Sequence, residues 1–94
     1  MKRLTPAAVK ADWTARGFSF EYWSDPPGRM WSDFVHDADE VAMLLEGEIE
    51  FTVGDKTLRP AIGEEVAIPA GVRHTVANVG AVPNRWCFGY RDRP

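Results

Sequence analysis

The chain has 94 residues, enough for one compact domain over residues 1–94, and its 45% hydrophobic and 27% charged content is that of an ordinary folded protein. A formal net charge of −3 gives no basic footprint and argues against a nucleic-acid partner. The single cysteine, Cys87, excludes an internal disulfide and suits a reducing compartment. The first residues lack the apolar segment of a signal peptide, and no apolar run reaches membrane-spanning length. We therefore expect a cytoplasmic protein without membrane contact.

One helix is predicted near the start of the chain, from about residue 6 to residue 16. Thr5 is a hydroxyl N-cap, Pro6 suits the first helical position, and Gly17 is a natural stop. Val9 and Trp13 lie four residues apart and form the predicted buried face. No other segment has helical spacing.

The remaining residues, 18–91, are predicted to be all-β, because Gly, Pro or Asn recurs between short apolar segments at the spacing of a sandwich or barrel. Phe18, Phe20 and Tyr22 alternate with polar residues, as in a half-buried strand. In chain order, the predicted strands cover residues 18–23, 30–36, 40–45, 48–53, 56–59, 65–68, 74–79 and 85–90.

Three potential metal ligands lie at the ends of these strands. His36 ends the second strand, Glu40 begins the third, and His74 begins the seventh. If the faces that carry them point into one barrel, the three side chains converge. Two imidazoles and one carboxylate form the set of the non-haem Fe(II) oxygenases, and Mn, Ni, Cu or Zn also fits. The competing interpretation is that both histidines are surface or core residues.

The spacing around these residues resembles the two sequence motifs of the cupin superfamily. The chain reads Gly28-x5-Phe34-x-His36-x3-Glu40-x6-Gly47 and, further on, Gly63-x5-Pro69-x-Gly71-x2-His74-x3-Asn78. The second motif is complete. The first departs from the family only at Phe34, where the family usually has its first histidine. The resemblance covers just over half of the chain.

This resemblance implies a small antiparallel jelly-roll β-barrel that follows the short helix. It also implies one divalent metal ion (Fe, Mn, Ni, Cu or Zn) held by His36, Glu40 and His74, and a dioxygenase- or isomerase-like reaction on a small organic molecule. Phe34 removes one ligand, and such a loss weakens metal binding by roughly 10- to 100-fold. A second interpretation therefore stays open: a non-enzymatic binding or sensing module without metal. Asp39 and Cys87 are minor candidates for the missing ligand.

The remaining expectations concern the ligand and the oligomer. We expect the substrate pocket to be lined by aromatic side chains, which favours a flat or apolar ligand over a free sugar: Trp31, Phe34, Trp86 and Phe88. Three arginines are available to hold a carboxylate or phosphate of the ligand: Arg29, Arg73 and Arg85. Small cupins tend to dimerise, so we also predict a homodimer with residues 18–23 at the contact.

Overall fold

The computed structural model describes residues 4–91, apart from the side chain of Asp33. The ends of the predicted domain, residues 1–3 and 92–94, lie outside the described residues. Helix α1 (Pro6–Ala15) begins as predicted, since the Thr5 hydroxyl oxygen accepts a hydrogen bond from the Ala8 N–H at 3.1 Å. The helix ends one residue earlier than expected, just before Gly17, which has a φ of 87°.

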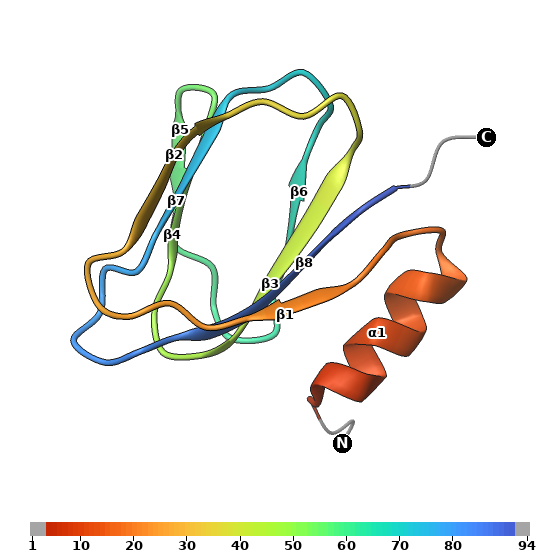
Figure 1. The fold of residues 1–94 in the computed structure, drawn as a ribbon, viewed down its shortest axis with the longest axis horizontal. Helices are drawn as coiled ribbons and strands as arrows, with labels where there is room; N and C mark the ends of the chain where they lie inside the picture. The colour runs from red at the N-terminus through yellow and green to blue at the C-terminus, as the bar shows by residue number, and fades with distance from the viewer. Residues whose placement is uncertain (1–3, 92–94) are drawn as a thin grey trace.

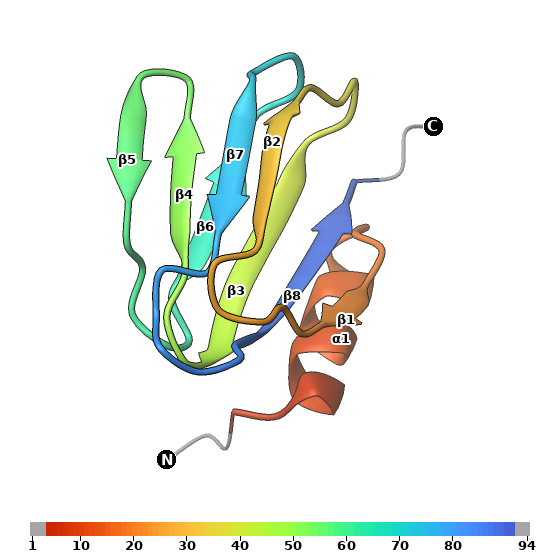
Figure 2. The same cartoon turned by 60° about the vertical axis from the view of Figure 1, so that its left-hand side comes forward.

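Within residues 4–91, eight antiparallel strands follow the helix, one for each predicted strand. Their bounds are β1 (Glu21–Trp23), β2 (Met30–Phe34), β3 (Glu40–Glu46), β4 (Glu50–Val53), β5 (Lys56–Leu58), β6 (Glu65–Ile68), β7 (His74–Ala77) and β8 (Arg85–Tyr90). They form two sheets that face each other, with the orders β1-β8-β3-β6 and β2-β7-β4-β5 (Figures 1 and 2). This arrangement confirms the predicted jelly-roll fold, although the two sheets do not close into a continuous barrel.

Strand β3 has apolar side chains on both faces because it lies between two cores. Ala42 and Leu44 face the gap between the sheets, where they join a core with Phe51 and Trp86. Val41 faces the other way, toward the core that α1 forms on the outer side of its sheet (Figure 1). By the alternation of a strand, Glu40 lies on the same side as Ala42 and therefore points between the sheets.

The predicted first strand, residues 18–23, is only partly formed, although Phe18 and Phe20 are more buried than Ser19 and Glu21, as its alternation predicts. Phe18 is buried under α1 and makes only an isolated bridge to Arg91, and Phe20 packs edge-on against Trp13 at 5.8 Å between ring centroids. Regular pairing starts only at Glu21, and all three side chains of β1 are exposed. Phe18 and Phe20 therefore pack against the helix, and the alternation along a strand gives no information about that contact. Among the described residues, no helix is long and apolar enough to cross a membrane.

Two hydrogen bonds donated by backbone N–H groups tie the segment after β2 to the turn before β7. Gly71 has a φ of 80°, a conformation that suits glycine, and its N–H donates to the His36 carbonyl oxygen at 2.8 Å. The Ala70 N–H donates to Asp39 Oδ1 at 2.9 Å. The segment that carries His36 is thus tied to the turn that leads into His74.

The outer core depends on Trp13. This side chain is fully buried, and its indole N–H donates to Glu65 Oε1 at 3.0 Å. We expect Trp13→Ala to lower the free energy of unfolding by about 3–5 kcal/mol, since it leaves a large cavity between helix and sheet. Urea unfolding measures this loss. The exposed Lys10→Ala on the same helix is the control and should change stability by less than about 0.5 kcal/mol. Equal effects of the two substitutions would contradict this account of the helix.

Candidate metal centre and pocket

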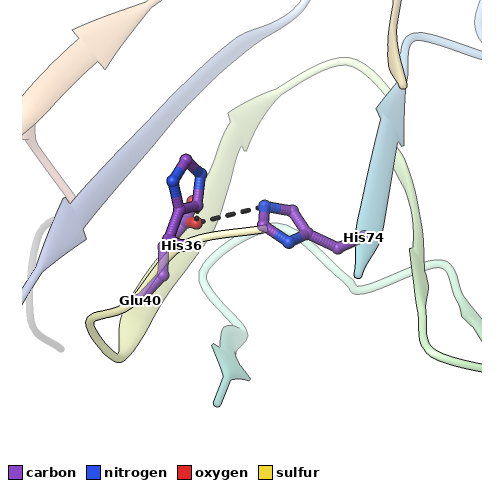
Figure 3. Close-up of side chains that lie close together, drawn as sticks. All are labelled: His36, Glu40 and His74. Atoms are coloured by element: carbon purple, nitrogen blue, oxygen red, sulfur yellow. Dashed lines mark ion pairs between the residues drawn. The ribbon is translucent and has the colours of Figure 1, made fainter. Parts of the chain in front are cut away.

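The three predicted ligands meet in the gap between the two sheets. His36 follows β2, Glu40 begins β3 and His74 begins β7. One potential ligand atom of each lies within 4.8 Å of the other two. Figure 3 shows the His74 imidazole pointing at the Glu40 carboxylate, with His36 beside them. The convergence that the strand pattern predicted is therefore present.

The Glu40 carboxylate is at the centre of this cluster. Its Oε1 lies 3.3 Å from His74 Nε2 and 3.7 Å from His36 Nε2, yet within the described part of the chain no group donates a hydrogen bond to it. Only 4% of the Glu40 side chain is exposed. Because a buried polar atom normally has a partner, this oxygen requires either a proton or a cation. Burial accordingly raises the pKa of Glu40 to about 7.

The contacts of His74 favour the tautomer whose Nε2 is free to bind a metal. Its Nδ1 lies 3.2 Å from the carbonyl oxygen of Val72, which can only accept, so Nδ1 carries the hydrogen and Nε2 carries the lone pair. That lone pair points at Glu40 Oε1. Burial and the nearby His36 lower the pKa of His74, against the opposing effect of the Val72 hydrogen bond. A neutral imidazole that faces a carboxylate oxygen without a hydrogen between them leaves a position for a cation.

His36 is more open and contacts a residue that the predicted site did not include. Its Nε2 lies 3.2 Å from the Tyr90 hydroxyl oxygen, and 32% of its side chain is exposed. Burial, followed by the charges of Glu40 and Glu21, raises the pKa of Tyr90 to about 12, so its hydroxyl keeps its proton. Trp86, Phe88 and Tyr90 follow one another at intervals of two residues, which was the signal in the sequence that Tyr90 belongs on this face.

Phe34 lies beside both imidazoles. Its ring is stacked on His36 at 5.9 Å between centroids, with 13° between the planes, and lies 6.1 Å from the His74 ring. Neither proposed substitute for the missing histidine belongs to the cluster. Asp39 accepts its hydrogen bond from Ala70, and Cys87 is fully buried in the outer core, where burial raises the pKa of its thiol to about 11. Among the described residues, the cluster therefore offers three candidate ligands.

A cavity of about 260 Å³ opens beside the three ligands. All four aromatic residues that we expected there line it, together with Trp23, Val76 and Tyr90. Trp31 and Phe34 both face it although they lie three residues apart, because the pairing of β2 with β7 shifts between them.

The expected arginines do not line this cavity. Arg29 lies over the Trp31 ring, with its guanidinium carbon 4.3 Å from the centroid. Arg85 pairs with Glu46 at 3.3 Å and donates a hydrogen bond to the Tyr22 hydroxyl. The idea that these arginines hold an anion in the pocket is therefore not supported.

Asp25 is the residue that sequence reasoning missed. Its buried carboxylate accepts hydrogen bonds from three indole N–H groups at 3.0–3.1 Å, those of Trp23, Trp31 and Trp86. All three rings line the cavity. Asp25 directly precedes a Pro-Pro-Gly turn and looks like an ordinary turn residue. The only signal was the number of tryptophans, since a buried indole N–H needs an acceptor.

Comparison with known proteins agrees with this architecture. Residues 21–90 match the Cupin domain family, and the chain therefore belongs to the cupins. A comparison with the curated proteins gave no match.

Solved structures with this fold include TT1209 from Thermus thermophilus, which is 31% identical, with a TM-score of 0.74 over 82% of this chain and 74% of that one. A Cupin 2 conserved barrel domain protein from Salinispora arenicola is 21% identical, with a TM-score of 0.71 over 81% and 64% of the two chains. The Cupin_2 domain of an XRE family transcriptional regulator from Enterobacter cloacae is 16% identical, with a TM-score of 0.75 over 87% and 90%. The last two share the fold alone.

The raised pKa of Glu40 has a consequence for stability in metal-free protein. A carboxyl whose pKa is about 7 when folded and 4.5 when exposed favours the folded state below pH 4.5. That contribution is lost as the pH rises to about 7, and the loss amounts to about 3 kcal/mol. Glu40→Gln cannot ionise and should remove it. Urea unfolding at pH 4.5 and pH 8, with chelator present, measures the difference between the two proteins.

The control for this measurement is Glu46→Gln, an exposed carboxylate on the same strand. It should follow the pH dependence of the parent. If Glu40→Gln shows the same pH dependence of stability as the parent, Glu40 is ionised and paired with an imidazolium. The conclusion that its Oε1 has no partner would then be wrong.

Proposed function

We propose that this cupin binds one divalent transition-metal ion through His36, Glu40 and His74, and that its aromatic pocket holds a small organic molecule beside the ion. The observation that carries the proposal is the buried Glu40 Oε1, which has no hydrogen-bond partner among the described residues and faces two imidazole nitrogens. A cation at this point would satisfy all three groups.

The donor set fits such an ion. Two imidazole nitrogens and one carboxylate oxygen suit Fe(II), Mn, Ni, Cu or Zn, and three protein ligands leave positions open for substrate. The neutral form of His74 is already favoured by burial, and its tautomer is favoured by the contact with Val72. Binding would therefore need loss of the proton from Glu40 and release of His36 Nε2 from the Tyr90 hydroxyl.

The residues of the chain supply the rest of the chemistry. When bound, the ion would act as a Lewis acid or oxygen activator, in a dioxygenase- or isomerase-like reaction. The Tyr90 hydroxyl keeps its proton and lies 3.2 Å from His36 Nε2, where it can donate a hydrogen bond to a ligand oxygen. Phe34, Trp86 and Phe88 present apolar rings to the pocket, and such surroundings strengthen electrostatic interactions within it.

A second function is favoured by Phe34. A phenyl ring takes the position of one family ligand and stacks on His36, as expected of a site that has lost its chemistry. The alternative is a binding or sensing module that takes up an organic ligand without metal. Metal content separates the two functions.

Metal titration tests the proposal directly. Chelator-treated protein is loaded with Zn²⁺, dialysed and analysed for zinc, and we expect about one ion per chain. His36→Ala and His74→Ala should each lower the affinity by roughly 100-fold or more, because each removes a direct ligand. Asp39→Asn is the matched control, a neighbouring carboxylate outside the cluster, and should retain the zinc. Zinc binding that survives when both His36 and His74 are replaced by alanine in one protein would contradict the assignment of these residues as ligands.

Phe34→His restores the fourth ligand of the family and should tighten zinc binding by roughly 10- to 100-fold. The position is close enough, since the Phe34 ring lies next to both imidazoles. Phe34→Leu removes the ring without adding nitrogen and serves as the control. Calorimetry compares the three proteins. Equal affinities for the histidine and leucine variants would place the ion elsewhere.

Homodimerisation stays a prediction. Strand β1 is at the edge of its sheet and exposes Tyr22 and Trp23, as expected of a strand that can pair with a second copy. A cytoplasmic location and the lack of a nucleic-acid partner also stay predictions.

A further inference from the structure

We propose that Asp25 is a positioning residue that holds three tryptophans as a subsite for the ring of a single-ring aromatic carboxylate. The subsite stands on the geometry of Asp25 alone. The placement of the carboxylate group rests on the proposed metal function.

The indoles come from three separate parts of the fold. Trp23 donates to Asp25 Oδ1 at 3.1 Å, whereas Trp31 and Trp86 donate to Oδ2 at 3.0 and 3.1 Å. They lie on β1, β2 and β8, so one carboxylate ties together side chains from both sheets. Asp25 itself is only 3% exposed.

The backbone of Asp25 is held as firmly as its side chain. Its N–H donates to Asn84 Oδ1 at 3.1 Å, and its carbonyl oxygen accepts from the Asn84 N–H at 3.0 Å and from Asn78 Nδ2 at 3.1 Å. Both asparagines are buried. The carboxylate is therefore a fixed point, and the orientation of each indole follows from it.

This arrangement uses every polar group of the three indoles. With their N–H groups bound to Asp25, the rings offer a ligand only apolar π surface. The hydrogen-bonding groups of the cavity are at its other end, where His36, Glu40, His74 and Tyr90 lie together. The cavity thus has an aromatic end and a polar end.

Phenylalanines separate the two ends. On one side, Phe34 lies 6.2 Å from Trp31 and 5.9 Å from His36, measured between ring centroids. On the other side, Phe88 lies 5.0 Å from Trp86 and 6.1 Å from Tyr90. A ligand that fills the cavity would therefore reach from the indoles, past these rings, to the candidate metal ligands.

The charges favour an anion with an aromatic ring over an organic cation. The Trp31 ring has a cation near its face and an anion at its N–H, since the Arg29 guanidinium carbon lies 4.3 Å from the ring centroid and the N–H donates to Asp25. At the polar end, a divalent ion with Glu40 as the single charged ligand would leave a net positive charge for a carboxylate to meet. A cavity of about 260 Å³ is just below the range for drug-sized ligands, which limits the ligand to one ring.

Nuclear magnetic resonance of the indole N–H groups tests the subsite. Zinc-loaded protein is titrated with benzoate, and the N–H signals of Trp23, Trp31 and Trp86 should shift. The fourth tryptophan, Trp13, is the internal control, because its N–H is bound to Glu65 in the outer core. Its signal should stay in place. A benzoate titration that moves no pocket indole, or moves all four equally, would overturn the proposal.

Two substitutions test the role of Asp25. Benzoate should bind at least about tenfold more tightly than acetate in the parent, because only benzoate fills the aromatic end. Asp25→Asn replaces one acceptor oxygen with an amide NH₂, which frees at least one indole and should reduce this preference to about threefold or less. Trp31→Phe should reduce it as well and covers the case in which Asp25→Asn does not fold. Trp13→Phe, the same change outside the cavity, should leave the preference unchanged.

The zinc content of each protein separates this proposal from the metal function. A preference for benzoate that is unchanged in Asp25→Asn and Trp31→Phe, or tighter binding of benzyltrimethylammonium than of benzoate, would overturn the subsite. Zinc bound without any indole response would also overturn it while the metal function stands. Indole shifts with benzoate in a protein that binds no zinc would support the subsite and contradict the metal function.

Discussion

The site depends on one buried polar atom, Glu40 Oε1, which accepts no hydrogen bond from any described residue. Leaving such an oxygen bare in a protein interior is costly, and the raised pKa of Glu40, about 7, expresses this cost. A proton removes the cost at low pH. A divalent ion removes it at neutral pH and also uses the lone pairs of His36 and His74. Metal binding is thus the state in which the Glu40 oxygen and the His74 lone pair both have a partner, whereas His36 Nε2 already contacts the Tyr90 hydroxyl.

The fold holds these groups together through strands and turns that are stabilised by their own core packing and backbone hydrogen bonds. Strand β3 is fixed by cores on both of its faces, so Glu40 must point between the sheets. The bond from the Gly71 N–H to the His36 carbonyl ties the two histidine segments to each other. On the far side of the pocket, Asp25 does the same for three indoles. The polar and aromatic ends of the cavity are therefore both organised by groups that a ligand would not need to touch.

Much of the fold and the core of the site could be predicted from the sequence, because both depend on short-range spacing. A period of two places Glu40 with Ala42 and Trp86 with Phe88, and turn residues mark most of the strand ends. Effects of distant packing were not predictable. Phe18 packs against the helix before the regular pairing of β1 begins, and the shift in β2 turns Trp31 to the same side as Phe34. Asp25 was missed because its three partners lie on separate strands. The spacing of residues along the sequence does not predict that three distant indoles contact one carboxylate.

Anomalous X-ray diffraction from crystals of the zinc-loaded protein tests the central claim most directly. The account predicts one strong zinc peak within about 2.0–2.2 Å of Glu40 Oε1 and of one ring nitrogen from each of His36 and His74. A cluster without a zinc peak, or with Glu40 Oε1 hydrogen-bonded to a protonated imidazole in the presence of excess zinc, would contradict it.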